Sequence, residues 1–140
     1  MNNYLIFFPV ALQILLTLAL YFLLSARKRK AAREGRVDES RRGIFDDAWP
    51  VDVILVNNCI RNQFEVPVLF YVLAVLLWAL NGVDLIALLL AGLFVLSRVV
   101  HALIHTGSNH VPTRRRLFMF GVVLVMLMLV LVFLALFKVL

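Results

Sequence analysis

The stretch Leu117–Phe137, LFMFGVVLVMLMLVLVFLALF, is apolar from end to end and contains no charged side chain. A helix of about 20 such residues is long enough to cross the hydrocarbon core of a bilayer, which is roughly 30 Å thick. We therefore expect a membrane-spanning helix over about residues 116–138.

Three further apolar runs precede it: Tyr4–Leu24, Val66–Leu80 and Leu85–Ile104. The run Val66–Leu80 is short for a span, so we expect its helix to begin upstream, in the polar segment before it. The predicted spans are then about residues 4–25, 51–81, 84–106 and 116–138. With 64% hydrophobic residues and a mean hydropathy of +0.99, the chain has more apolar surface than a small soluble domain can bury. The sequence predicts an all-α integral membrane four-helix bundle, one domain over residues 1–140.

Basic residues are concentrated in the loop 26–50, between the first and second spans. Eight of the fourteen Lys and Arg lie in Arg27–Arg42, and Arg114–Arg116 precede the last span, whereas Asn81–Asp84 has none. Because Lys and Arg are enriched in cytoplasmic loops, we expect both basic segments in the cytoplasm and both termini on the non-cytoplasmic side. No nucleic-acid motif accompanies this charge, so we expect membrane lipids and not nucleic acid as partners.

Polar and ionisable residues recur within two of the predicted spans. Four of them are spaced i, i+3, i+4 and i+7 on the second span: Asn58, Arg61, Asn62 and Glu65. Three more are spaced i, i+3 and i+7 on the third span: Arg98, His101 and His105. On continuous helices, each set shares one face. In the expected topology both sets, with the arginines before the last span, lie near the cytoplasmic side.

Ionisable residues inside a span are costly, roughly 2.5–3.5 kcal/mol each, unless they are paired or hydrated. One interpretation is mutual neutralisation, in which Glu65 pairs with Arg61 or with Arg98, or the long side chains snorkel to the interface. The other is a ligand site. An excess of Arg with neutral donors and one carboxylate suits a small polyanion that also carries an ammonium. Glutathione fits this description, as do other zwitterions.

A metal site is a further alternative. His101 and His105 are four residues apart, and with Glu65 they are of the types that bind Zn or Fe. The neighbouring arginines repel a cation, so we expect no metal. Cys59 is the only cysteine and is interpreted as a small helix residue.

The stretch Arg61–Tyr71, RNQFEVPVLFY, resembles the second-helix signature of the MAPEG family, the membrane-associated proteins in eicosanoid and glutathione metabolism. In that signature an Asn is followed three residues later by Glu, with a basic residue upstream and a Pro shortly after. Asn62, Glu65 and Pro67 match it, with Arg61 as the basic neighbour.

The stretch 97–121, SRVVHALIHTGSNHVPTRRRLFMFG, resembles the segment that joins the third and fourth helices of the same family. The four spans, the chain length and the basic first loop also agree with it. The resemblance therefore covers nearly the whole chain.

The resemblance implies a homotrimer of four-helix subunits, with glutathione as co-substrate between adjacent subunits and open to the cytoplasm. It implies that Arg61, Asn62 and Glu65 bind the tripeptide, that Arg27 contacts a carboxylate and that Arg114 is the catalytic residue near the sulfur. The other expected ligand-binding residues are Asn58, Arg98, His101 and His105. A lipophilic second substrate would enter from the lipid between helices.

A role for an arginine near the sulfur has a physical basis. A free thiol has a pKa of about 8.5 and is mostly protonated at neutral pH. A nearby guanidinium favours the thiolate, which is the nucleophile.

Three positions depart from the family pattern. Asn58 stands where eukaryotic members usually carry Arg, and His105 stands where they carry a ligand-binding Tyr. Arg115 stands where a prostaglandin synthase has Ser, so we do not expect an eicosanoid-specific synthase. The sequence has no organelle-retention signal, which is compatible with the bacterial inner-membrane location that we expect.

We therefore expect a glutathione-dependent transferase or peroxidase that acts on lipophilic electrophiles, for example in detoxification. The alternative is a non-catalytic binding or structural membrane protein of the same fold. A transporter or proton relay is a third class. It would need polar residues through the whole membrane depth, and Leu69–Leu80 and Ala87–Val95 have almost none.

Overall fold

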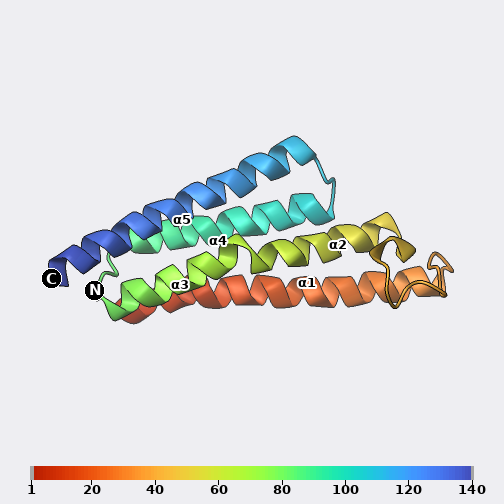
Figure 1. The fold of residues 1–140 in the computed structure, drawn as a ribbon, viewed down its shortest axis with the longest axis horizontal. Helices are drawn as coiled ribbons and strands as arrows, with labels where there is room; N and C mark the ends of the chain where they lie inside the picture. The colour runs from red at the N-terminus through yellow and green to blue at the C-terminus, as the bar shows by residue number, and fades with distance from the viewer. Residues whose placement is uncertain (1, 140) are drawn as a thin grey trace.

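The computed structural model describes residues 2–139, and within that part of the chain it contains helices and turns but no strand. Four helical units run side by side along the bundle (Figure 1). Their bounds are η1 Asn3–Ile6 with α1 Phe7–Arg33, α2 Val51–Arg61 with η3 Asn62–Phe64 and α3 Val66–Ala79, α4 Leu85–Thr106, and α5 Val111–Val139. All four units are long and apolar enough to cross a membrane, which confirms the predicted all-α membrane bundle.

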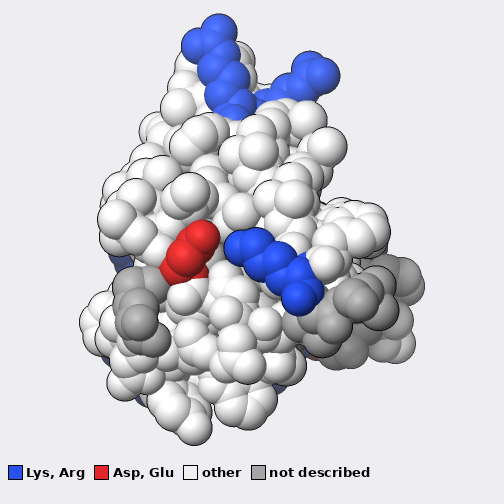
Figure 2. Space-filling model, turned by 90° about the vertical axis from the view of Figure 1, so that its left-hand side faces the viewer, with Lys and Arg blue, Asp and Glu red and all other residues white. Residues whose placement is uncertain are grey.

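Both termini lie at one end of the bundle, while the first loop and the α4–α5 turn lie toward the other end (Figure 1). Figure 2, which looks onto the end with the termini, shows a mostly uncharged surface, with an acidic and a basic side chain near its centre and further basic side chains at its upper edge. The basic segments are therefore gathered toward the loop end, as the positive-inside rule requires of a four-span protein. That the loop end faces the cytoplasm stays a prediction.

Two helices are longer than predicted. Helix α1 continues to Arg33, and not to about residue 25, because its basic last turns are rich in Ala, Lys and Arg, which are good helix formers. It stops where Gly35 adopts a left-handed conformation with φ of 65° and Arg36 N–H donates to the Ala31 carbonyl. Helix α5 begins at Val111, ahead of the predicted residue 116, so that Arg114 lies on its first turns.

The second span covers Val51–Ala79, close to the predicted residues 51–81, but it is divided into α2, η3 and α3 and is not one continuous helix. Helix α2 ends at Arg61, and Glu65 lies outside the helical region with φ of −103° and ψ of −107°. Pro67 is the cause, because it has no N–H for the helical bond to Gln63 and its ring crowds the preceding turn. Glu65 is therefore not held on one helical face with Asn58, Arg61 and Asn62, which precede the interruption.

Two apolar clusters hold the bundle together. The larger one joins α3, α4 and α5 toward the end with the termini, and it includes a stack of Phe70 on Phe94 with ring centroids 4.6 Å apart. The smaller one, nearer the loop end, joins α1, α2 and α4 through Leu20, Cys59 and Ala102. Many other Leu, Val and Phe side chains remain exposed, as expected of surfaces that face lipid.

A buried amide pair ties α1 to the interruption of the second span. Gln13 Nε2 donates to Gln63 Oε1 at 2.9 Å, and both side chains are inaccessible to solvent. Gln63 Nε2 in turn donates to the Cys59 carbonyl at 3.1 Å. The Gln63 amide thus gives a hydrogen-bond partner to the Cys59 carbonyl, a backbone group beside the helix interruption.

Gln63→Leu is expected to lower the free energy of unfolding by about 1–2 kcal/mol, because the Gln13 amide is left buried without its partner. Thermal unfolding in detergent, followed by circular dichroism, measures the change. The double variant Gln13→Leu/Gln63→Leu removes both partners and should recover most of the loss. Additive losses in the double variant would show that the amide pair does not stabilise the bundle.

Candidate functional site

The polar face of α4 is buried inside the bundle. Arg98, His101 and His105 are 0%, 1% and 3% exposed, and Arg98 is the largest fully buried side chain among the described residues. Their spacing places them one above another along α4, where they face the second span and α5. The prediction that these three residues form one polar group is supported by this arrangement.

The guanidinium of Arg98 is held by weak contacts only. Its NH2 lies 3.5 Å from the Asn62 carbonyl, and its Cζ lies 5.6 Å from the centroid of the Phe118 ring. Within residues 2–139, its Nε and NH1 have no hydrogen-bond partner and no carboxylate forms an ion pair with it. A buried charge without a partner costs several kcal/mol, so this geometry favours an anion beside Arg98.

The two imidazoles of α4 lie next to one another. The ring centroids of His101 and His105 are 5.5 Å apart and the rings are nearly perpendicular, at 83°. Asn62 Nδ2 lies 3.5 Å from His105 Nδ1, so the amide can donate to this nitrogen when the proton is on Nε2. His101 Nδ1 is buried and has no partner in the described part of the chain. Within residues 2–139, the cluster therefore contains an imidazole nitrogen without a hydrogen-bond partner and a guanidinium without an ion-pair partner.

Cys59 lies beside these imidazoles, which the sequence analysis did not foresee. The potential ligand atoms of Cys59, His101 and His105 lie within 4.8 Å of one another, and all three residues are buried. Glu65, which was considered as a metal ligand with the two histidines, is not part of this set. Such a set contains metal-binding residue types, but the Arg98 guanidinium close by disfavours a divalent cation. The absence of a metal stays a prediction.

Arg61 and Glu65 are exposed and are not hydrogen-bonded to the buried cluster in the described part of the chain. The Arg61 side chain is 61% exposed and forms an ion pair with Asp46, in the short helix η2 (Asp46–Ala48) of the first loop. Asn57 Nδ2 also donates to Asp46, at 3.3 Å. Glu65 is exposed and makes no ion pair with Arg61 or Arg98 among the described residues, so the predicted pairings of Glu65 are wrong. Asn58 is half-buried on α2.

Arg27 connects α1 to α2 and α4 through hydrogen bonds to backbone carbonyls. Its NH1 donates to the Asp52 carbonyl at 2.7 Å and its NH2 donates to the Thr106 carbonyl at 2.8 Å. These bonds join the end of α1 to the first turn of α2 and the last turn of α4. Both terminal nitrogens are therefore engaged by the chain's own backbone.

Arg114 is positioned by the α4–α5 turn. Its NH1 donates to Asn109 Oδ1 at 2.5 Å, and Asn109 adopts a left-handed conformation with φ of 51°. Gly107 makes this turn possible, because a Cβ there would lie 2.8 Å from the Leu103 carbonyl oxygen. Arg114 is half-buried at the start of α5.

A model of the MAPEG family matches residues 6–134, which include the second and third membrane spans, most of the first and last, the buried cluster and Arg114. The chain belongs to the MAPEG family. Neither a curated protein nor a solved structure matches the chain. Membership in the MAPEG family links the chain to membrane proteins of glutathione and eicosanoid metabolism.

The structure brings together only part of the residues that the MAPEG resemblance suggested. Asn62, Arg98, His101 and His105 contact one another, with Arg114 nearby. The remaining residues do not join this cluster: Arg27 and Arg61 are bound elsewhere, Glu65 is exposed and Asn58 is half-buried. Two residues of the cluster were missed, Cys59 and Gln63. The sequence contains a signal for both, because Cys59 lies three residues before Asn62 and Gln63 lies four residues after Cys59, a spacing that favours a shared inward face.

Proposed function

We propose that this MAPEG-family chain is a membrane-embedded transferase or peroxidase, which uses glutathione or a similar low-molecular-weight thiol against lipophilic electrophiles. One observation carries the proposal most strongly, namely the buried Arg98 guanidinium with two unpartnered nitrogens beside two imidazoles. An anionic ligand would supply the missing partner.

In this proposal a carboxylate of the thiol binds to Arg98, whose Nε–H and NH1 groups have no hydrogen-bond partner within residues 2–139. His101 Nδ1, which is also unpartnered, is available for a further hydrogen bond to the tripeptide. Asn62 positions this site by its contacts with His105 and Arg98. Arg27 is not part of this buried site, because its bonds to the Asp52 and Thr106 carbonyls hold its guanidinium at the loop end of the bundle.

The proposal includes a homotrimer with the thiol between subunits. Glu65 supports it, because an exposed carboxylate on a membrane span is unfavourable by roughly 2.5–3.5 kcal/mol unless something pairs with it. A neighbouring copy that covers this face would bring Glu65 and Arg61 into a shared site with the buried cluster.

Arg114 is proposed as the catalytic residue. Its guanidinium would favour the thiolate form of the bound thiol and would stabilise negative charge that develops during attack. The thiolate forms a new sulfur–carbon bond with the electrophile, whose leaving group departs with the electron pair. The lipophilic electrophile reaches the site from the bilayer.

A non-catalytic thiol-binding protein is the second candidate. The observation that favours it is the bond from Arg114 to Asn109, which engages one nitrogen of the proposed catalytic guanidinium. In this case the thiol would bind as the protonated form and would not turn over.

Purified protein in detergent, incubated with glutathione and a chlorodinitrobenzene or an aryl hydroperoxide, separates these candidates. The proposal predicts product formation above the uncatalysed rate, with saturation in glutathione. Binding without product would favour the non-catalytic protein. No binding at millimolar glutathione would contradict both candidates for this thiol.

A further inference from the structure

A second polar cleft lies at the loop end of the bundle, between the last turns of α1, the first turn of α2 and the end of α4. Its volume is about 750 Å³. Arg27, Lys30 and Arg36 line it together with Asp52, and Val51 and Leu55 add an apolar wall. None of these residues belongs to the buried cluster around Arg98.

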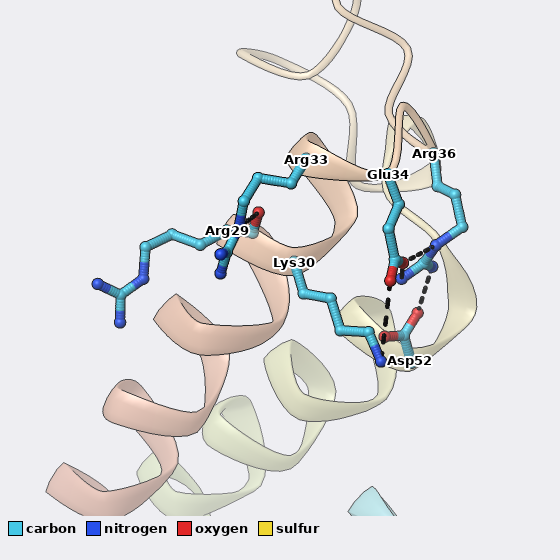
Figure 3. Close-up of polar contacts among 6 residues, drawn as sticks. All are labelled: Arg29, Lys30, Arg33, Glu34, Arg36 and Asp52. Carbon is cyan, nitrogen blue, oxygen red and sulfur yellow. Dashed lines mark hydrogen bonds and ion pairs between the residues drawn. The ribbon is translucent and has the colours of Figure 1, made fainter.

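The charges around this cleft do not cancel. Arg36 pairs with Glu34 at 2.7 Å and with Asp52 at 3.0 Å, and Lys30 lies 3.9 Å from the same Glu34 (Figure 3). Arg27 donates only to backbone carbonyls, so no carboxylate neutralises it. Three cations therefore face two carboxylates, which leaves one positive charge. That excess equals the single negative charge of a phosphodiester.

The position of the cleft along α1 matches the headgroup layer of a bilayer. The apolar run of α1 ends at Leu24, and Arg27 and Lys30 follow three and six residues later. At 1.5 Å per residue they lie about 4.5 and 9 Å beyond the last apolar residue. The headgroup layer extends roughly 5–8 Å beyond the hydrocarbon core on each side. Val51, which is 69% exposed, continues the apolar surface beside the cleft.

We propose that this cleft binds the phosphodiester headgroup of an anionic phospholipid such as phosphatidylglycerol. The phosphate lies against Arg27 and Lys30, and the glycerol and the start of the acyl chains lie against Val51 and Leu55. A zwitterionic phospholipid adds an ammonium next to these cations and binds less well. The bound lipid joins the three helices that Arg27 already connects.

Lys30→Gln tests this proposal with little risk to the fold, because Lys30 is 66% exposed and makes only the 3.9 Å contact with Glu34. The full-length protein is equilibrated in mixed micelles that contain phosphatidylglycerol and phosphatidylcholine, and bound lipid is identified by native mass spectrometry. The original chain should retain one phosphatidylglycerol per subunit in preference to phosphatidylcholine. Lys30→Gln should weaken this binding about fivefold, and Lys30→Glu should weaken it further.

Arg42→Gln is the matched control. It removes a charge from the loop that follows α1, where Arg42 pairs with Glu39 and does not line the cleft, and it should leave lipid binding unchanged. Equal retention of the two lipids would overturn the proposal, as would equal effects of Lys30→Gln and Arg42→Gln. Displacement of phosphatidylglycerol by glycerol phosphate or glutathione would also overturn it, because the cleft would then be a site for soluble anions.

Discussion

Arg98→Met is expected to abolish thiol binding and to leave the bundle as stable as the original chain or more stable. Removal of a buried charge that pairs with a ligand weakens affinity by about 100-fold or more. Without ligand, however, Arg98 is buried with two unpartnered nitrogens. Its replacement by an apolar side chain of similar length is neutral or stabilising by roughly 1–4 kcal/mol. Calorimetric titration with glutathione and thermal unfolding in detergent measure the two effects.

Arg29→Met provides the same chemical change at an exposed position on α1, where Arg29 points away from the neighbouring ion pairs (Figure 3). This control should change neither glutathione binding nor the unfolding temperature. Normal binding by Arg98→Met would show that Arg98 is not the anion site. A large fall in its unfolding temperature would instead show that the arginine has a structural role in the ligand-free protein.

Arg114→Ala is expected to lower kcat by about 10²- to 10³-fold, the effect typical of a lost group that stabilises transition-state charge. The Michaelis constant for the thiol should change much less. Without the guanidinium, the pKa of the bound thiol returns toward about 8.5, so the remaining activity should rise with pH through that region. The pH dependence of kcat, measured with a saturating electrophile, checks the direction of this shift.

Arg116→Ala is the matched control for Arg114, because Arg116 is exposed and lies two residues further along α5. It should keep nearly the full rate and the original pH profile. Equal losses in the two variants would contradict a specific role for Arg114. A lower rate without a shift of the pH profile would indicate that Arg114 only supports the α4–α5 turn through Asn109.

The four membrane-spanning helices were predictable because an apolar run of about 20 residues has the length that a helix needs to cross a bilayer. What lies outside the hydrocarbon was less predictable, and α1 shows why. Its last turns contain Lys28 and Arg33, which end the apolar pattern but favour the helical state. Hydropathy marks where the helix leaves the membrane, whereas Gly35 marks where the helix itself stops.

The site was only partly predictable because its geometry depends on a helix interruption. A continuous helix would place Asn62 and Glu65 on one face, but the interruption before Pro67 turns Asn62 inward and leaves Glu65 exposed. Pro67 was visible in the sequence, but the change of direction that it causes was not. The same limit applies to the ion pair of Arg61 with Asp46, which depends on how the first loop folds back along α2.

Cys59 illustrates a second limit. Its proximity to His101 and His105 depends on the register between α2 and α4, which no local pattern encodes. The inward face of α4, by contrast, followed from the spacing of Arg98, His101 and His105, and the structure buries all three. Spacing within one helix was therefore informative, and contacts between helices needed the structure.

The most direct test of the proposed function is the ultraviolet absorbance of the thiolate when glutathione is titrated into the purified protein at neutral pH. The account predicts a saturable thiolate signal for the original chain and for Arg116→Ala, and its loss in Arg114→Ala. Saturable glutathione binding with no thiolate signal in the original chain, or an undiminished signal in Arg114→Ala, would contradict it.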